Sequence, residues 1–270
     1  MIKVENLLFA YQEESIILNN INLEFKEGHV YGLLGANGSG KSTLFLSLMG
    51  LLKPKSGSIS YQGNVLSYKK KDLFAYRQEV ALVFQNPDQQ IFYSIVKDDV
   101  AFALRNLGYD EAEIDKRVTI ALSELGILHL KEQPVQYLSY GQKKRVAIAG
   151  ALALESKWLL LDEPTAGLDP EGRRLMMVII NKLATKGKNI IISSHDMDLV
   201  YDSCDYFYLL KKGEVLAQGL KDTVFSDREL LLNAKLEQPW LVKIHQQLGM
   251  PLYANEDIFF EETIKKRSRG

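Results

Sequence analysis

An eight-residue glycine-rich segment, GANGSGKS at residues 35–42, constrains the fold of this chain more than any other feature. It follows a nearly continuous apolar run at 29–34, typical of a strand buried on both faces. It precedes an apolar helix predicted from Lys41 to about Leu51. In this strand–loop–helix context, the pattern G-x-x-x-x-G-K-[ST] predicts a loop whose backbone N–H groups turn inward around phosphates. We therefore predict a nucleotide phosphate site here, rather than an accidental glycine-rich turn.

Two side chains at the end of this segment carry the expected chemistry. The Lys41 ammonium can reach the β- and γ-phosphates of a nucleotide, and the Ser42 hydroxyl can ligate Mg²⁺. The N-terminus of the following helix adds positive potential at the same place. The sequence therefore predicts that a nucleotide such as ATP binds here together with Mg²⁺.

A second buried strand, predicted at residues 158–161, ends in two carboxylates, Asp162 and Glu163. Asp162 would stand at the carboxyl edge of the strand, where it can hold the metal from the side opposite Ser42. Glu163 can orient or deprotonate an attacking water. Such a pair could also simply cap a loop, but beside a phosphate loop it indicates nucleotide hydrolysis.

Composition excludes several classes of protein. The chain has 270 residues, of which 46% are hydrophobic and 25% charged, so it is folded rather than mainly disordered. A net charge of −1 gives no global attraction for nucleic acid, and no nucleic-acid partner is expected.

The single cysteine, Cys204, suits a reducing compartment. No apolar run approaches the ~18–20 residues of a membrane span. We expect a cytosolic protein whose membrane association comes through a partner.

Alternating strand and helix patterns organise the chain up to about residue 220. Short strands of alternating polarity occupy residues 2–31, and a mostly helical stretch occupies 86–155. Buried strands and helices alternate in the remainder. This order predicts an α/β domain with a largely parallel sheet. The pattern changes again beyond residue 220, and we interpret residues 221–270 as a small C-terminal appendage.

Residues 138–142, Leu-Ser-Tyr-Gly-Gln, resemble the signature loop of the ATP-binding cassette (ABC) family, although Tyr140 stands where that family usually has glycine. The basic-then-apolar segment 143–150 follows, as in the family. The resemblance covers residues 1 to about 220. It implies a P-loop NTPase fold with a RecA-like core, an N-terminal antiparallel β subdomain and an inserted helical subdomain at about 86–155. It also implies that Ser139 and neighbouring amides bind the γ-phosphate held by another subunit.

Four further positions match family motifs. Gln85 matches the glutamine that contacts Mg²⁺ or the attacking water, and His195 matches the histidine that hydrogen-bonds the γ-phosphate. Residues 166–169 resemble the loop that crosses the dimer interface, with Asp169 as a helix cap too. Tyr11 matches the aromatic residue that stacks on adenine. Taken alone, these would be an ordinary strand-end glutamine, a structural histidine and a core aromatic.

The resemblance thus implies a full set of site residues. Catalytic roles fall to Glu163, His195, Gln85 and Lys41. The Mg²⁺ contacts fall to Ser42, Gln85 and Asp162. Nucleotide contacts fall to Tyr11, Gly35, Asn37, Gly38, Ser39, Gly40, Lys41, Ser42, Thr43, Ser139, Gly141 and Gln142.

Narrower patterns are similar to the ATPases of energy-coupling-factor importers, and most of all to the cobalt/nickel branch rather than the vitamin branch. They lie at 85–90, 98–102 and 141–150. This resemblance implies a second ATPase subunit, identical or not, bound head to tail, and integral membrane transport subunits. It implies a peripheral position on the cytoplasmic face of the cell membrane. Asp88 could contact a basic helix of the membrane subunit, or be an ordinary solvated carboxylate.

The predicted C-terminal appendage leaves its role open. Ser226 and Glu229 have capping-box spacing ahead of an apolar run, and a second helix is expected from Pro239 to Gly249. The apolar stripes of these helices could pack on the parent domain or against the second ATPase subunit. A regulatory ligand site is the remaining alternative.

Two other classes of function compete with a transport motor. Soluble ABC-type ATPases of DNA repair need a long heptad-bearing insertion, but only about 100 residues separate the phosphate loop from the signature segment. Translation relatives usually carry two cassettes per chain, and this chain has one. A P-loop kinase or GTPase would leave the signature segment and His195 without a role.

Overall fold

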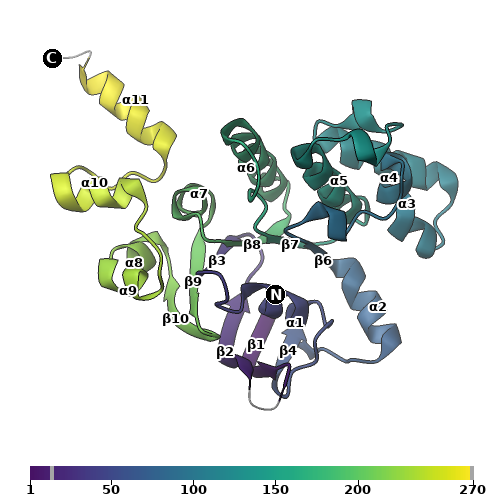
Figure 1. The fold of residues 1–270 in the computed structure, drawn as a ribbon, viewed down its shortest axis with the longest axis horizontal. Coiled ribbons are helices and arrows are strands. Elements are labelled where there is room, and N and C mark those ends of the chain that lie inside the picture. The colour runs from purple at the N-terminus through teal and green to yellow at the C-terminus, as the bar shows by residue number, and fades with distance from the viewer. Residues whose placement is uncertain (13–14, 268–270) are drawn as a thin grey trace. The chain divides into compact units, whose positions relative to one another are not determined.

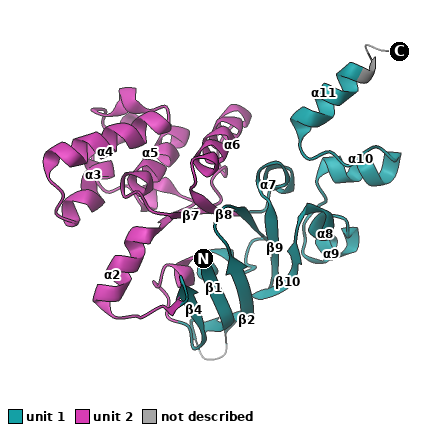
Figure 2. Cartoon of the chain, turned by 180° about the vertical axis from the view of Figure 1, so that it is seen from behind, with its two compact units in different colours: residues 1–44, 54–63, 194–270 teal, residues 45–53, 64–193 magenta. Residues whose placement is uncertain are grey.

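A computed structural model describes residues 1–12 and 15–267, so the last three residues of the predicted appendage lie outside the described part. The chain forms two compact units (Figure 2). Unit 1 comprises residues 1–44, 54–63 and 194–270, and unit 2 comprises residues 45–53 and 64–193. The boundary expected after residue 220 stays a prediction, because the units divide the chain differently.

The N-terminal strands of unit 1 form an antiparallel sheet, as predicted. Strand β1 lies between the other two and pairs antiparallel with both. Their residues alternate between buried and more exposed positions over much of their length, because successive side chains of a strand point to opposite faces. The strands are β1 (Ile2–Ala10), β2 (Ile16–Phe25) and β4 (Ser56–Tyr61).

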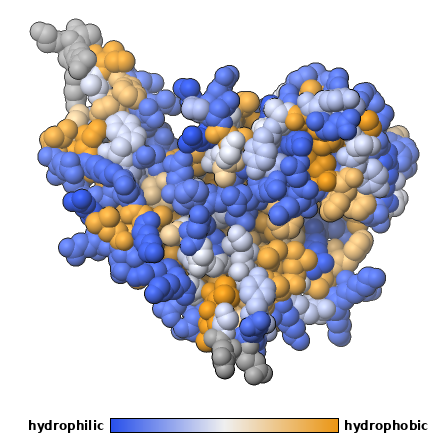
Figure 3. All heavy atoms as spheres, in the orientation of Figure 1, coloured by the Kyte–Doolittle hydropathy of each residue, from blue (hydrophilic) through white to orange (hydrophobic). Residues whose placement is uncertain are grey.

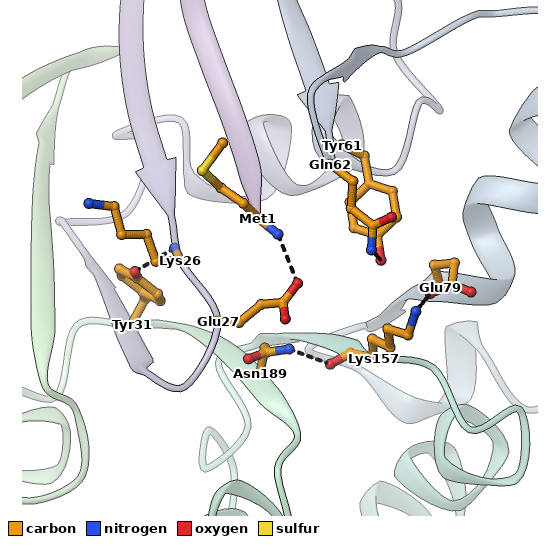
Figure 4. Close-up of polar contacts among 9 residues, drawn as sticks. All are labelled: Met1, Lys26, Glu27, Tyr31, Tyr61, Gln62, Glu79, Lys157 and Asn189. Carbon is orange, nitrogen blue, oxygen red and sulfur yellow. Dashed lines mark hydrogen bonds and ion pairs between the residues drawn. The ribbon is translucent and has the colours of Figure 1, made fainter.

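A second group of strands in unit 1 begins with β3 (Val30–Leu34), all five residues of which are buried. It pairs in parallel with β9 (Tyr206–Lys211), which forms an antiparallel hairpin with β10 (Glu214–Gly219). Tyrosine hydroxyls join this group to the antiparallel sheet. The Tyr31 hydroxyl accepts from the Lys26 N–H at 2.6 Å (Figure 4), and the Tyr208 hydroxyl donates to the Glu24 carbonyl at 2.6 Å.

Unit 2 contains a fully parallel group of strands in the order β8-β7-β6. These are β6 (Val80–Val83), β7 (Trp158–Asp162) and β8 (Asn189–Ser194). Every residue of β7 is buried, as expected for a strand covered on both faces. Side-chain contacts also link the chain at the starts of these strands. Lys157 pairs with Glu79 at 3.0 Å, and the Asn189 amide donates to the Lys157 carbonyl at 3.2 Å (Figure 4).

The predicted inserted helical subdomain is present in unit 2. Helices α3, α4 and α5 pack on one another (Figure 1). Helix α4 begins after Asp110, whose side chain accepts from the Glu113 N–H at 2.9 Å. The helices of this unit are α2 (Lys70–Glu79), α3 (Val96–Asn106), α4 (Glu111–Glu124), α5 (Tyr140–Ala153) and α6 (Pro170–Thr185), with short 3₁₀ turns at Pro87–Gln89, Leu128–Leu130 and Val135–Tyr137. Helix α1 (Lys41–Leu48) follows the glycine-rich segment.

The C-terminal part of unit 1 is helical. Its helices are α7 (Met197–Ser203), α8 (Lys221–Phe225), α9 (Arg228–Asn233), α10 (Trp240–Leu248) and α11 (Glu256–Arg267). Helix α9 is capped by Asp227, which accepts from the Leu230 N–H at 2.9 Å, and not by the expected Ser226. The Ser226 hydroxyl donates to the Asp222 carbonyl instead. Helix α10 runs between Pro239 and a left-handed Gly249, as predicted.

Apolar side chains remain exposed on the last helices of unit 1. They include Leu248, Phe260 and Ile264. Figure 3 shows hydrophobic surface near the C-terminal end of the chain. Among the described residues, no helix combines the length and apolar character needed to cross a bilayer.

Candidate nucleotide-binding site

The phosphate loop joins β3 to α1 in unit 1 and adopts a conformation that only glycine accommodates easily. Gly40 has a φ of 106°, and an added Cβ there would lie 2.9 Å from a Leu18 methyl group. At Gly35 a Cβ would meet the Ser39 hydroxyl at 2.4 Å. The Gly213 N–H donates to the Ser39 carbonyl at 2.9 Å and supports the loop from the β9–β10 turn.

The polar groups of this loop suit phosphate. Lys41 is buried, and its Nζ donates to the carbonyl of Gly35 at 2.5 Å, so the ammonium lies within the loop. The buried Ser39 hydroxyl has no hydrogen-bond partner within the described part of the chain. A buried hydroxyl of this kind fits a loop that receives phosphate oxygens. Ser42 is exposed on the first turn of α1, and Asn37 and Gly38 are exposed at the loop tip.

His195 and Tyr11 also belong to unit 1. His195 follows β8 and is exposed. Together with Ala36 and Asn37 of the phosphate loop it lines a cavity of about 400 Å³, so the structure brings the histidine close to the loop. Tyr11 follows β1, is 59% exposed, and meets Phe9 edge to face with ring centroids 5.0 Å apart. Tyr11 is therefore a surface aromatic rather than part of the core.

The two predicted carboxylates stand at the end of β7 in unit 2. Asp162 and Glu163 are 7% and 6% exposed. The Ser193 hydroxyl of β8 donates to Asp162 and accepts from the Glu163 N–H at 3.1 Å. The same N–H also donates to the Ser193 carbonyl at 3.1 Å. Glu163 has a φ of 46°, which is the left-handed region that a residue with a Cβ seldom adopts.

The signature segment forms the N-terminus of α5. Ser139 and Gln142 make a capping box: the Ser139 hydroxyl accepts from the Gln142 N–H at 3.3 Å, and the Gln142 side chain accepts from the Ser139 N–H at 2.8 Å. Both Ser139 and Tyr140 are exposed. The Tyr140 hydroxyl donates to the backbone carbonyl of Gln85 at 3.3 Å, which brings the signature segment to the end of β6.

Other predicted positions of unit 2 have clear structural contacts. Asp169 caps α6 and accepts from the Gly172 N–H at 2.6 Å, as its expected capping role requires. Asp88, exposed, forms an ion pair with Lys143 at 2.8 Å. The Gln85 side chain is exposed beyond β6. A contact of Asp88 with another subunit stays a prediction.

The donors proposed for Mg²⁺ have the right chemistry. Among residues 1–12 and 15–267, no three His, Cys, Asp or Glu side chains gather into a metal site of their own. The candidates Ser42, Gln85 and Asp162 all offer oxygen, and Mg²⁺ is typically held by one or two carboxylates together with substrate phosphates. Each of these residues therefore offers an oxygen donor of the kind that Mg²⁺ prefers.

Comparison with known proteins decides the family. The family profile described as ABC transporter matches residues 18–166, which is more than half of the chain. The chain belongs to the ABC transporter family. It is 52% identical to the cobalt import ATP-binding protein CbiO of Salmonella paratyphi A, over 98% of this chain and 97% of that protein. It is 46% identical to the energy-coupling factor transporter ATP-binding protein EcfA of Methanocaldococcus jannaschii, over 88% of this chain and 86% of that protein.

Solved structures agree with this family membership. The structure of cbiO1 from Clostridium perfringens, described as part of the ABC transporter complex cbiONQ, matches with a TM-score of 0.79 and 43% identity, covering 91% of this chain and 98% of that one. The dimer of MJ0796, a bacterial ABC transporter cassette, matches with a TM-score of 0.73 and 31% identity. This match covers 82% of this chain and 98% of that one. The predicted P-loop fold, the family and the ATPase activity of an ABC ATP-binding domain are thereby confirmed.

Two residues of this ABC ATP-binding domain were not predicted from the sequence. Ser193 donates to the Asp162 carboxylate and accepts from the backbone N–H of Glu163, and only the parallel pairing of β7 with β8 places it beside Asp162. Lys144 lies one turn into α5 and is 3% exposed. Its Nζ donates to the carbonyls of Glu163 at 2.8 Å and Pro164 at 3.1 Å. No local pattern indicated this contact, because Lys144 lies within a run of basic residues.

Proposed function

We propose that this chain is the ATP-hydrolysing subunit of a membrane importer, and that two such subunits bind ATP between them, head to tail. The supporting observation is that one chain has two helix starts suited to phosphate, one after the loop at 35–42 and one at the capped start of α5 at Ser139. A γ-phosphate enclosed by both elements meets more positive potential than either supplies alone. The MJ0796 dimer supports assembly from two cassettes.

The phosphate loop and its neighbours bind the nucleotide in this proposal. Adenine stacks on the exposed ring of Tyr11, and the loop amides and Lys41 hold the β- and γ-phosphates. Ser139 of the partner subunit approaches the γ-phosphate from the other side. Bound Mg²⁺, held by Ser42, Gln85 and Asp162, would neutralise charge on the phosphate oxygens.

Hydrolysis uses the buried end of β7. The Glu163 carboxylate orients the attacking water and accepts its proton. His195 hydrogen-bonds the γ-phosphate and helps to position that water. Because the charge of the transferred group spreads over its oxygens, the surrounding donors stabilise it most when both half-sites are closed. Formation of the closed dimer thus depends on bound ATP, and hydrolysis of ATP lets the two subunits separate.

The transported solute is a cobalt ion in this proposal, with nickel as the alternative. Support comes from the 52% identity to the cobalt import protein CbiO and the structural match to cbiO1 of the cbiONQ complex. The similarity to EcfA supports an energy-coupling-factor arrangement with integral membrane subunits. The chain would then lie on the cytoplasmic face of the membrane as a peripheral subunit.

Substitution of Glu163 tests the hydrolytic role directly. Glu163→Gln should keep ATP affinity, lower turnover at least ~100-fold and trap an ATP-dependent dimer visible by size-exclusion chromatography. Glu155→Gln is the matched control, because Glu155 also has a positive φ of 58° but pairs with Arg117 at 3.1 Å. Unchanged turnover in Glu163→Gln would remove Glu163 from this role. Cobalt uptake in cells carrying the chain and its membrane subunits then tests the solute.

A further inference from the structure

We infer that Lys144 is a positioning residue for hydrolysis, which holds the backbone of Glu163 so that its carboxylate meets the water. The inference rests on the proposed role of Glu163. Lys144 is 3% exposed and donates to the Glu163 carbonyl at 2.8 Å and to the Pro164 carbonyl at 3.1 Å. It therefore ties helix α5 to the two residues that follow β7.

The backbone at Glu163 needs such support because it is strained. Its φ of 46° is a conformation that residues with a Cβ seldom adopt, and it persists only where neighbouring groups enforce it. Ser193 holds the N–H of Glu163 through both its carbonyl and its hydroxyl, each at 3.1 Å. Lys144 holds the carbonyl on the other side of the same Cα. Both peptide groups are fixed, so the direction in which the side chain leaves the backbone is fixed.

A purely structural role is a weaker explanation for a lysine at this place. Burial lowers the pKa of Lys144 to about 8, because desolvation disfavours the charged ammonium. A lysine, however, reaches two carbonyls at once and carries up to three donors. The arrangement fits a requirement for geometry at Glu163 more than for stability.

Lys144 also connects Glu163 to the signature segment. The Tyr140 ring lies 5.5 Å from the Lys144 Nζ, and the Tyr140 hydroxyl donates to the Gln85 carbonyl. The ends of β6 and β7 and the start of α5 therefore form one set of contacts within unit 2. In the proposed dimer, the same helix start that meets the partner's nucleotide also holds the water-activating residue of its own site.

Steady-state ATPase kinetics of the full-length chain test this inference. Lys144→Met, which removes the donors but keeps an unbranched side chain one atom shorter, should lower kcat at least ~10-fold while the KM for ATP changes less than ~2-fold. Lys144→Gln keeps an N–H donor pair and should lose ~2–5-fold in kcat. Lys188→Met is the matched control, because Lys188 also donates to a backbone carbonyl, that of Ser156 at 2.8 Å, and burial also lowers its pKa. It should keep full kcat.

A double-mutant cycle separates positioning from general destabilisation. If Lys144 acts through Glu163, its substitution should cost no further activity in a Glu163→Gln background. Wild-type kcat in either folded Lys144 variant, or an equal loss in both backgrounds, would overturn the inference; if the Met variant does not fold, the Gln variant completes the cycle. Wild-type turnover in Glu163→Gln alone would instead overturn the proposed function, so the two failures are distinguishable.

Discussion

The Ser193 hydroxyl contacts both Asp162 and Glu163 at the end of β7, and we expect its removal to change both stability and metal dependence. This side chain is fully buried, donates to Asp162 and accepts from the Glu163 N–H at 3.1 Å. In Ser193→Ala, the Glu163 N–H retains the Ser193 carbonyl as an acceptor. The buried Asp162 carboxylate loses its hydroxyl donor with nothing in exchange.

The magnitude follows from these two contacts. The hydrogen bond to the charged Asp162 contributes ~1.5–3 kcal/mol to stability. The loss of the hydroxyl as an acceptor for the Glu163 N–H costs less than ~1 kcal/mol, because the Ser193 carbonyl remains. Ser193→Ala should therefore lower the free energy of unfolding by about 2–3 kcal/mol. For a chain of this size, each kcal/mol shifts Tm by roughly 2–4 °C. We expect a Tm lower by about 4–12 °C.

Thermal denaturation followed by circular dichroism provides the assay, and Ser156→Ala provides the matched control. Ser156 is also buried in unit 2, but its hydroxyl has no hydrogen-bond partner among the residues that the structure describes. Ser156→Ala should therefore shift Tm by less than ~2 °C. Ser193→Ala should also raise the Mg²⁺ concentration needed for half-maximal ATPase activity, since Asp162 is less firmly held. Equal Tm shifts in the two variants would refute this account of Ser193.

Two further substitutions test the two phosphate-binding elements. Lys41→Ala should weaken ATP binding at least ~10-fold in titration calorimetry, because an ammonium within the phosphate loop is lost; unchanged affinity would exclude the predicted phosphate contact. Ser139→Arg should leave ATP binding by the isolated subunit within ~2-fold but abolish hydrolysis by the dimer, since it places a bulky side chain at the shared face. Full hydrolysis in that variant would contradict the shared site, and the lost N-cap should cost about 1 kcal/mol of stability.

The parts of the site that could be predicted from sequence are those encoded by adjacent residues. The phosphate loop is one continuous segment between a strand and a helix, so its spacing alone defines backbone amides, Lys41 and Ser42. The same holds for the carboxylates that end β7, because an apolar strand places the next residues at its edge. The capping box at Ser139 is equally local. Such features depend on chain geometry within a few residues rather than on tertiary packing.

Features that depend on tertiary packing were either not predicted from the sequence or predicted at a neighbouring residue. Ser226 and Glu229 have capping-box spacing, yet Asp227 caps α9 and Ser226 donates to Asp222. Both Ser226 and Asp227 can cap a helix, so sequence preference alone could not choose between them. Ser193 belongs to β8, and only the pairing of β7 with β8 places it beside Asp162. Sequence spacing contains no information about that register.

Three consecutive basic residues at the start of α5 show why the role of Lys144 required a structure. A basic run predicts a solvated face, but successive residues of an α-helix point about 100° apart, so three neighbours face three environments. Lys143 reaches the surface carboxylate of Asp88, and Arg145, half-buried, donates to the Leu125 carbonyl at 3.4 Å. Lys144 points inward to the carbonyls of Glu163 and Pro164. The chemistry of a lysine at a nucleotide site is thus decided by its direction on the helix, and that direction is set by which face of α5 packs against the end of β7.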